Sequence, residues 1–427
     1  MPTIEEVTSY LTDFSYCEDN QLTIDMIETI SPATLIEKKT IDGIKIPLFI
    51  NEYWTSRQRQ TASIHEISYR ACFKPQLPRF FIELLTDPGD TVYDPFAGRG
   101  TTIIEAALLE RKVIANDVNP LSRILCQPRL NPPSILEVRN RLSEVPFDNK
   151  VSSDLDLSMF YHPDTEKELL SLQAYLDRKK THYIEDDLDR WIRMVATNRL
   201  SGHSKGFFSV YTMPPNQAVS AKRQKIINLK RNQKPDYRNV KDLILRKSDQ
   251  LMRKMTAQQI RSLNKVSDIA MFLEVDASET QMITDQSVNL TVTSPPFLNV
   301  VQYAADNWLR CWFNQIETDV VGKKITMATT LQDWSAAMSR VFKELYRITK
   351  PGGWIAFEVG EVRGGKINLE EAVVPLGLEC GFQCLGVVIN RQSFTKTSNI
   401  WGVKNNQAGT NSNRIVLFSR PRPDHAV

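Results

Sequence analysis

A short stretch of the chain combines a hydroxyl group, two prolines and an aromatic ring at the end of an apolar segment. Residues 288–297 read VNLTVTSPPF, so Ser294, Pro295, Pro296 and Phe297 follow what we expect to be a buried strand. Proline has no backbone donor and a fixed φ, so two in succession end a central strand in a rigid, extended corner. The carbonyls there have no partner in the sheet, and an aromatic ring follows directly. The stretch is therefore either a plain strand exit or a reaction site.

A second candidate is the glycine-containing loop DPFAGRGTT at residues 94–102. Gly98 and Gly100 let the backbone approach a ligand, and Asp94 stands at a strand end, where open α/β sheets bind ligands. Asp117 follows Gly98 by 19 residues, at the end of a second expected strand, where a carboxylate can accept both hydroxyls of a ribose. The loop lacks a third glycine at dinucleotide spacing and a Gly-Lys-Ser/Thr triplet for a triphosphate. It favours a nucleoside without phosphate, of which S-adenosylmethionine is the common example.

A parallel sheet would bring these residues together, and the surrounding pattern predicts one. A strand, the glycine loop, a helix over TTIIEAALLERK and a second strand over KVIANDVNP form a β-α-β half-unit. Further strands are expected at AMFLEVDAS, VNLTVTSPPF, GGWIAFEVGE, FQCLGVVINR and NRIVLFSR. The expected fold class is α/β, a Rossmann-like sheet with helices on both faces.

The middle of the chain has helical periodicity instead. Leu188, Trp191, Ile192 and Val195 fall at i, i+3, i+4 and i+7 and predict one apolar helix face. We expect a largely helical insertion here. The chain then divides into an N-terminal arm, a catalytic domain in two pieces and the insertion, at residues 1–60, at 61–125 with 270–427, and at 126–269.

The insertion carries an uneven share of positive charge. Residues 201–270 contain 15 Lys or Arg and 4 Asp or Glu, a local balance of 15 − 4 = +11 in a chain of net charge +3. Such a run is either a solvated helical face or the footprint of a polyanion. The candidate contacts with nucleic acid are Lys222, Arg223, Lys225, Lys230, Arg231, Lys234 and Arg238.

Four motifs in a compatible order give the chain a family resemblance. DPFAGRGTT, ANDVNP, VDAS and TSPPF together resemble the S-adenosylmethionine-dependent amino-methyltransferases of DNA, over about residues 65–125 and 270–420. The Ser-Pro-Pro-Phe form resembles the N4-cytosine branch, since adenine N6 enzymes typically carry Asp or Asn at the first position. The long insertion before VDAS is a departure, because known arrangements more often place the target-recognition part after that motif or at the end.

The resemblance implies roles for the matching residues. Ser294, Pro295, Pro296 and Phe297 would form the catalytic base pocket. Asp117 would take the ribose hydroxyls, and Asp276 would accept from the adenine amino group. Taken singly, Asp94 or Asp276 would more often be a turn carboxylate and Phe297 a core residue. The full set expected at the cofactor is Phe73, Lys74, Asp94, Pro95, Phe96, Ala97, Gly98, Gly100, Thr101, Thr102, Asn116, Asp117, Asp276 and Ala277.

Composition excludes several other classes. With 41% apolar and 24% charged residues, the 427-residue chain is ordinary globular material, without a run of about 18 apolar residues for a membrane span. The start, MPTIEEVTSYL, lacks the features of a signal peptide. Six scattered cysteines and five dispersed histidines predict no zinc site, and a bacterial cytosol is the expected location. None of the cysteines follows a proline, which argues against thiolate-dependent methylation of cytosine carbon 5.

The leading hypothesis is a DNA methyltransferase that acts on the exocyclic N4 of cytosine in double-stranded DNA. The target base would be extruded from the duplex, because its amine is unreachable inside the stack, and would be methylated by direct in-line attack. We expect either the modification half of a restriction–modification system, with a cognate endonuclease as a candidate partner, or a solitary bacterial enzyme, and no metal. The alternatives are an adenine N6 or RNA amino-methyltransferase on the same scaffold, and a nucleic-acid-binding protein without activity.

Overall fold

The computed structural model describes most of the chain. The described residues are 1–15, 33–54, 62–69, 72–147, 151–213, 218–296, 306–324, 328, 330–359, 361–362, 367–391 and 412–423. Among them, none of the helices combines the length and apolarity needed to cross a bilayer.

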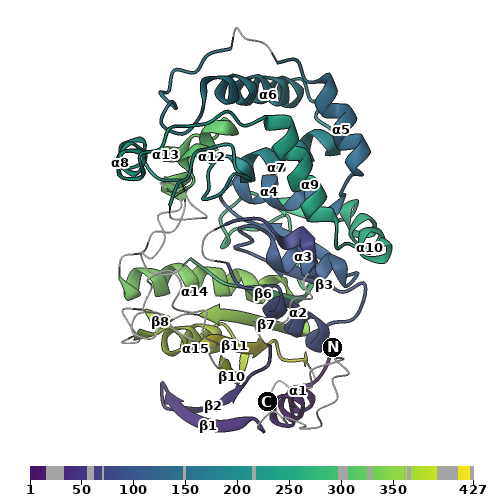
Figure 1. The fold of residues 1–427 in the computed structure, drawn as a ribbon. Helices are drawn as coiled ribbons and strands as arrows, with labels where there is room; N and C mark the ends of the chain where they lie inside the picture. The colour runs from purple at the N-terminus through teal and green to yellow at the C-terminus, as the bar shows by residue number, and fades with distance from the viewer. Residues whose placement is uncertain are drawn as a thin grey trace, which may run out of the picture.

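A single large sheet organises the lower part of the molecule in Figure 1. Its central strands β5, β4, β3, β6 and β7 are parallel, β11 runs antiparallel between β7 and β10, and β2 and β1 complete the far edge. The nine strands in spatial order are β1 (Leu35–Ile41), β2 (Ile44–Asn51), β10 (Gln383–Arg391), β11 (Ser412–Ser419), β7 (Thr349–Val359), β6 (Val288–Thr293), β3 (Thr91–Asp94), β4 (Lys112–Asn116) and β5 (Met271–Leu273).

The strand order reverses between β3 and β6. From β3 the chain moves outward through β4 to β5, and it then returns to place β6 on the other side of β3. Ligands of open α/β sheets bind outside the carboxyl ends of the strands at such a switch point. Asp94 at the end of β3 and Thr293 at the end of β6 meet there, with Thr293 Oγ1 donating to Asp94 Oδ1 at 2.6 Å.

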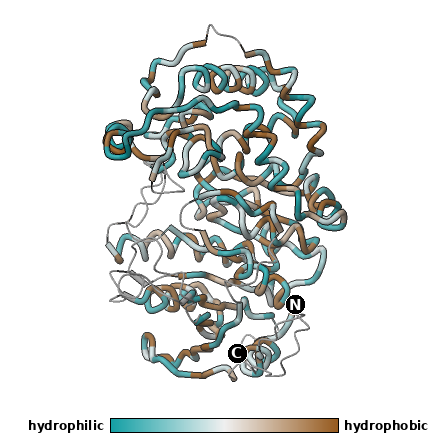
Figure 2. The backbone as a smooth tube through the Cα atoms, viewed as in Figure 1, coloured by the Kyte–Doolittle hydropathy of each residue, from teal (hydrophilic) through white to brown (hydrophobic). Residues whose placement is uncertain are grey.

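Helices cover both faces of the sheet, as expected. On one face lie α1 (Ile4–Thr12), α2 (Gln76–Leu85) and α3 (Thr101–Leu108); on the other lie α14 (Leu331–Ile348) and α15 (Glu370–Glu379). Alternate residues of β7 serve the two cores, since Trp354 packs into the first and Ile355 into the second. Figure 2 shows hydrophobic and hydrophilic residues alternating around the surrounding helices, as amphipathic packing requires.

The N-terminal residues extend the sheet instead of forming a separate arm. β1 and β2 are a hairpin whose Asp42–Gly43 turn has positive φ at both positions, 48° and 78°. This Asp-Gly turn matches the twist of the strands that it joins. β2 then pairs in parallel with β10, and Val7 of α1 is buried in the main core. The described residues of this segment, 1–15 and 33–54, therefore pack with the sheet domain.

The insertion is largely helical, as expected, and lies above the sheet in Figure 1. Trp191, Ile192 and Val195, which the periodicity predicted on one face, are buried, whereas Leu188 is half-buried. The region has no separate core, because its apolar side chains join those of α2, α3 and the sheet in one cluster. Its helices are α4 (Leu121–Cys126), η2 (Gln127–Leu130), α5 (Ile135–Glu144), α6 (Pro163–Thr181), α7 (Asp187–Arg199), α8 (Ala221–Arg231), α9 (Val240–Met252) and α10 (Ala257–Ser267).

A later segment also joins this helical layer, although the sequence division gave it to the catalytic domain. Gln173 Nε2 of α6 donates to the carbonyl of Trp312 at 2.9 Å, and Asn314 Nδ2 donates to Thr197 Oγ1 of α7 at 2.9 Å. The segment contains α12 (Trp308–Phe313) and α13 (Thr318–Lys324). The smaller elements elsewhere are η1 (Ser63–His65), β8 (Glu361–Val362) and β9 (Ile367–Asn368).

Candidate active site at the ends of β3, β4 and β6

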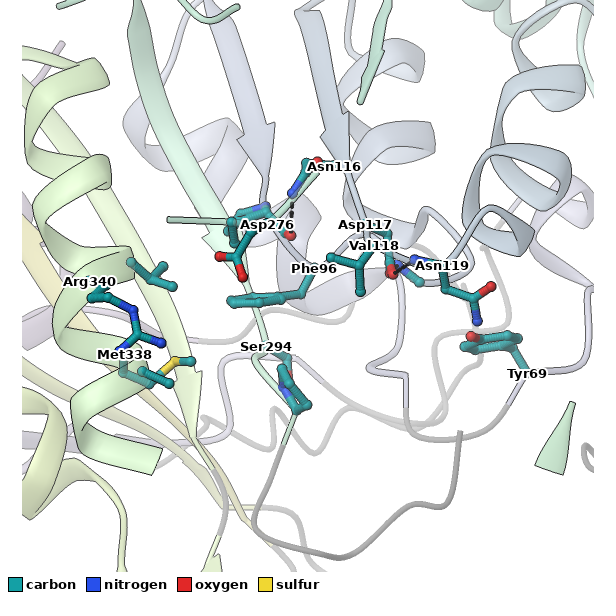
Figure 3. Close-up of a pocket in the computed structure, with 16 residues that line it drawn as sticks. Tyr69, Phe96, Asn116, Asp117, Val118, Asn119, Asp276, Ser294, Met338 and Arg340 are labelled. Carbon is teal, nitrogen blue, oxygen red and sulfur yellow. Dashed lines mark hydrogen bonds between the residues drawn. The ribbon is translucent and has the colours of Figure 1, made fainter. Parts of the chain in front are cut away.

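A pocket opens at the switch point of the sheet. Figure 3 shows it between Asp117 and Asn119, which follow β4, and Met338 and Arg340 of α14. Seven of the expected cofactor residues line it: Pro95, Phe96, Gly98, Asn116, Asp117, Asp276 and Ala277. Ser294 and Pro296 of the expected base pocket line it too.

The remaining expected cofactor residues do not line the pocket, so their role at the cofactor stays a prediction. They are Phe73, Lys74, Asp94, Ala97, Gly100, Thr101 and Thr102. Asp94 is 2% exposed and lies behind the wall, where its Oδ1 accepts from the Phe96 N–H at 3.1 Å as well as from Thr293. Burial raises the pKa of Asp94 to about 6. Its carboxyl therefore shapes the loop and ties β3 to β6.

Gly100 also has a packing role in place of the expected ligand approach. Its φ is +75°, and a Cβ at this position would lie 2.2 Å from Cys126 Sγ. The glycine is required because the start of α3 meets α4 closely there. The two threonines that follow it are buried, and Thr102 Oγ1 donates to the Val292 carbonyl of β6 at 3.2 Å.

Asp117 is the most firmly held group that faces the pocket. Its Oδ2 accepts from the Gly98 N–H at 2.9 Å, and its Oδ1 accepts from the Asn119 N–H at 2.9 Å. Burial raises the pKa of Asp117 to about 6, although the two hydrogen bonds act in the opposite direction and favour the ionised form. The carboxylate is thus fixed at the end of β4 before any ligand arrives, with further lone pairs available to hydroxyl donors.

Asp276 is a turn residue and a pocket residue at once. Its Oδ1 accepts from the Ser278 N–H at 2.8 Å, and the side chain is exposed. Asn116 holds this turn against β4, because its side-chain amide exchanges hydrogen bonds with the backbone of Val275 at 3.0 and 3.1 Å. The Asp276 side chain therefore closes the turn and lines the pocket.

The Pro-Pro corner is held by a helix of the opposite face. Trp334 Nε1 of α14 donates to the Pro296 carbonyl at 2.9 Å, so this carbonyl has a partner, contrary to the expectation for the corner. Pro295 is buried and does not line the pocket. Phe297 lies outside the described residues.

A buried acid that sequence reasoning missed lies beside Ser294. Glu358, near the end of β7, is 8% exposed, and its Oε1 accepts from Asn413 Nδ2 at 2.5 Å. Burial raises the pKa of Glu358 to about 7, although hydrogen bonds from Asn413 and Ser294 favour the ionised form. The only signal in the sequence was one charged residue inside the apolar strand WIAFEV.

Comparison with known proteins finds similarity to DNA methyltransferases. The model of a DNA methylase family, N6_N4_Mtase, matches residues 37–121, from β1 to the start of α4. The type II methyltransferase M.BsoBI of Geobacillus stearothermophilus is 21% identical over 90% of this chain and 91% of its own length. M.MvaI of Kocuria varians, also a type II methyltransferase, is 26% identical over 42% of this chain, and the chain spans only 42% of it. The chain is thus similar to DNA methylases at residues 37–121 and, at low identity, to a type II methyltransferase over most of its length.

Solved structures give weaker likenesses. A putative DNA modification methylase of Thermus thermophilus, complexed with S-adenosylmethionine, is 22% identical over 34% of this chain and 54% of that one, with a TM-score of 0.22. The cyclase SpnF covers 84% of this chain and 88% of its own at 10% identity, with a TM-score of 0.33. Likenesses this weak add nothing to the strand order given above.

S-adenosylmethionine is the cofactor that the sequence motifs predict, and the lining of the pocket fits it. Two carboxylates, Asp117 and Asp276, and one arginine, Arg340, are the charged side chains of the lining. An acidic lining suits a nucleoside that carries a sulfonium and an ammonium group and no phosphate. Within the described ranges, no cluster of three or more His, Cys, Asp or Glu side chains is placed to hold a metal ion.

The sequence missed the pocket residues that come from outside the family motifs. Tyr69 precedes the motif segment, and Met338 and Arg340 belong to α14, which is far from the motifs in sequence. The amphipathic pattern of α14 predicts a helix and gives no indication that one of its edges borders the pocket.

The basic residues expected to contact DNA fall into two groups. Lys222, Arg223, Lys230 and Lys234 are exposed on or after α8, as is Arg231, which stacks on the Tyr211 ring at 3.8 Å. Lys225 is exposed and pairs with Asp156 at 3.1 Å. Arg238 is a correction, because its side chain is only 10% exposed and binds Asp236 and the carbonyls of Ser204, Phe207 and Ser209.

The exposed set lies beside the segment that follows the base pocket. Trp308 Nε1 of α12 donates to the Val219 carbonyl at 3.1 Å, and the Ala218 N–H donates to the Asp306 carbonyl at 2.8 Å. The start of α8 is therefore tied to the chain that emerges after the tetrapeptide.

Proposed function

We propose that this protein transfers a methyl group from S-adenosylmethionine to the exocyclic N4 of cytosine in double-stranded DNA. The observation that carries the proposal is the hydroxyl of Ser294 at the pocket, with the buried carboxyl of Glu358 behind it. The type II methyltransferases that resemble the chain support DNA as the substrate and a restriction–modification system as the context. A cognate endonuclease that recognises the same site is the expected partner.

The residues of the chain divide the work between cofactor and base. When bound, the cofactor supplies an electrophilic methyl group on a sulfonium. Asp117 accepts from the ribose hydroxyls, and Asp276 accepts from the adenine amino group. The backbone around Phe96 and Gly98 holds the methionine part. Because these groups hold the cofactor in a fixed position, the methyl carbon can be placed in line with the attacking nitrogen. This placement supplies most of the rate.

Ser294 and Glu358 act at the amine of the base. A conjugated exocyclic amine gains positive charge as it attacks, so acceptors aimed at its protons lower the barrier. The Ser294 hydroxyl accepts one such hydrogen bond while it donates to the ionised Glu358 carboxylate. Trp334 keeps the Pro-Pro corner rigid through the Pro296 carbonyl, so that Ser294 stays aimed at the amine. Phe297 stacks on the extruded base.

An adenine N6 methyltransferase on the same scaffold is the second candidate, because the matching family model covers both N6 and N4 enzymes. The serine at position 294 favours cytosine, since adenine enzymes of the resembling family typically have an acid or amide there. An RNA substrate and a binding protein without activity are the remaining alternatives.

Methyl transfer from labelled S-adenosylmethionine to double-stranded DNA and to RNA tests the proposal. We expect label in DNA and none in RNA, and no label with Ser294→Ala under the same conditions. Label in RNA alone would overturn the substrate, and cofactor binding without any transfer would favour the binding protein. A Lys265→Met variant, changed on the exposed surface of α10 away from the pocket lining, serves as the active control.

A further inference from the structure

A second hollow borders the cofactor pocket, and Tyr69 lines both. It lies among η1, the glycine loop and the helices α7 and α9. Three cationic side chains line it, namely Arg99 of the glycine loop, Arg199 at the end of α7 and Lys247 of α9. None of the roles proposed above uses these three groups.

The three cations are bound to neutral partners. Arg199 is 8% exposed, donates to the backbone and side-chain oxygens of Asn198 and stacks on the Phe207 ring at 4.0 Å. Lys247 is 4% exposed, and its Nζ donates to Gln250 Oε1 at 3.2 Å. In the part of the chain that the structure describes, neither forms an ion pair with a carboxylate.

The surroundings do not restore the balance of charge. Arg99 donates to the carbonyls of Ile67 and Phe73, and the buried Arg129 also binds carbonyl groups. Glu66 is the acid that lines the hollow, and Gln250 donates to it. Burial, with the charge of Arg199 as a second cause, lowers the pKa of Lys247 to about 7. Glu66 also pairs with Arg253 at 3.9 Å, so one shared acid faces the three cations of the hollow. Buried cations without an ion-pair partner are costly, and an anionic ligand would stabilise the hollow.

A phosphodiester group fits this arrangement and its position. Guanidinium groups bind phosphate oxygens through pairs of N–H donors, and an ammonium adds a point charge. The hollow is close to the base site, since Tyr69 lines both the hollow and the pocket that Ser294 lines. An extruded nucleotide stays attached to its backbone, so the flanking phosphates must come close to the base pocket. The cofactor carries no phosphate that could occupy the hollow.

We infer that the hollow lined by Arg99, Arg199 and Lys247 binds a backbone phosphate of the strand that carries the target base. This inference rests on the proposed action on DNA and assigns part of the substrate to a site separate from the exposed basic residues of α8. Those residues would contact phosphates further along the duplex.

Lys247→Met tests the inference, with Lys265→Met as the matched control. Lys265 lies on α10, is exposed and pairs with Glu110, so its replacement also removes one positive charge. The affinity for sheared genomic DNA is measured as a function of salt concentration, together with the melting temperature of each protein. Loss of one phosphate contact should reduce the slope of log K against log salt by about 0.9 and weaken binding by roughly tenfold or more.

The melting temperature separates binding from structure. Because Lys247 is buried without an ion-pair partner, Lys247→Met should melt at the wild-type temperature or above it. Lys265→Met should keep the wild-type salt slope for DNA binding. An unchanged salt slope for Lys247→Met would overturn the inference, whatever the melting temperature of this variant. Arg199→Gln provides a second reading should Lys247→Met fail to fold.

A further arm distinguishes a nucleic-acid phosphate from a free anion. Inorganic phosphate is titrated against chloride at equal ionic strength, and binding to wild-type protein is followed by melting temperature. One result would overturn the assignment to DNA: phosphate stabilises the wild-type protein, and Lys247→Met leaves the salt slope for DNA binding unchanged. The hollow would then be a site for free anions. Failure of methyl transfer to DNA would overturn the proposed function, whereas the change in salt slope would still report on the hollow.

Discussion

The proposed cofactor half and the proposed base half of the candidate active site are held together in different ways. At β3 and β4, Asp117 is fixed by the N–H groups of Gly98 and Asn119, both from the same β-α-β half-unit. At β6 and β7, the partners come from distant parts of the chain, since Glu358 lies behind Ser294 and Trp334 of α14 holds Pro296. The position of Asp117 is therefore set within its own motif, and Asp276, after β5, reaches the first half from further along the chain. The second half is formed only when β6, β7 and α14 have packed together. Changes in the first should therefore alter cofactor affinity, and changes in the second should alter turnover.

The largest effect is expected from Ser294→Ala. Loss of one preorganised acceptor should reduce kcat by about 100- to 1000-fold, as loss of a comparable group does at other polar transition states. The dissociation constant of S-adenosylmethionine, measured by calorimetry, should change less than about twofold, because Asp117 and Asp276 are untouched. An equal loss of turnover and cofactor affinity would break the division between the two halves.

In the cofactor half, the effect of Asp117→Ala should exceed that of Asp276→Ala. Asp117 is half-buried and held on both oxygens, so its removal should weaken cofactor binding by about 100-fold, through the loss of charge-assisted hydrogen bonds. Asp276 is exposed, and its loss should weaken binding by roughly tenfold or less. The same calorimetry measures both variants. The reverse order would mean that the second carboxylate anchors the cofactor.

The pH dependence of kcat in Glu358→Gln tests the role of this carboxyl in the base half. The pKa of Glu358 is raised to about 7, so wild-type kcat should rise as pH increases through 7 and the carboxylate forms. In Glu358→Gln, kcat should be about tenfold lower and should lack this ionisation. A merely structural role would lower kcat equally at all pH values and leave the ionisation in place.

Stability should change in the opposite direction from activity. A pKa raised in the folded state means that the native protein binds the proton more tightly than the unfolded chain does. The contribution of Glu358 to folding is therefore present at low pH and is lost as pH rises through about 7. Above that pH, Glu358→Gln should melt at a higher temperature than the wild type. A lower melting temperature for this variant at about pH 8 would contradict the assignment of a buried carboxyl with a raised pKa.

The smallest effect is expected from Trp334→Phe. The ring is 1% exposed, and its N–H donates to the Pro296 carbonyl, so phenylalanine keeps most of the packing and removes the hydrogen bond. A neutral hydrogen bond contributes about 1 kcal/mol, so kcat should fall roughly fivefold with unchanged cofactor affinity. Unchanged kcat would show that the Pro-Pro corner is rigid without its helix.

The sequence predicted the local half of this site better than the distant half. The glycine loop and the acid at the end of the next strand stand within one β-α-β half-unit, so their spacing alone indicated a pocket at Gly98 and Asp117. Glu358 and Trp334 reach the tetrapeptide across the sheet, and such contacts depend on strand order and register, which no short motif encodes. Asp94 and Gly100 were assigned to the ligand because a motif shows only which residue type occupies a position. It does not show whether a ligand or another part of the protein contacts that residue.

The same limit applies to the domains and to the basic segment. The pattern predicted the helical insertion and the strands that follow it, but the pairing of β2 with β10 joins segments that are far apart in the chain, such as Leu48 and Val387. Arg238 looked like its basic neighbours in sequence, yet the folded chain places it against three carbonyl groups. Local charge and periodicity could not reveal either result, because both arise from long-range packing.

Nucleoside analysis of DNA that the protein has methylated tests the central claim most directly. Genomic DNA from a strain without methylation is incubated with the protein and S-adenosylmethionine, digested to nucleosides and analysed by mass spectrometry. N4-methylcytosine is the predicted product, and its absence with Ser294→Ala would tie the reaction to the base half of the site. N6-methyladenine would contradict the account of Ser294 while leaving the fold, the family and the cofactor half in place.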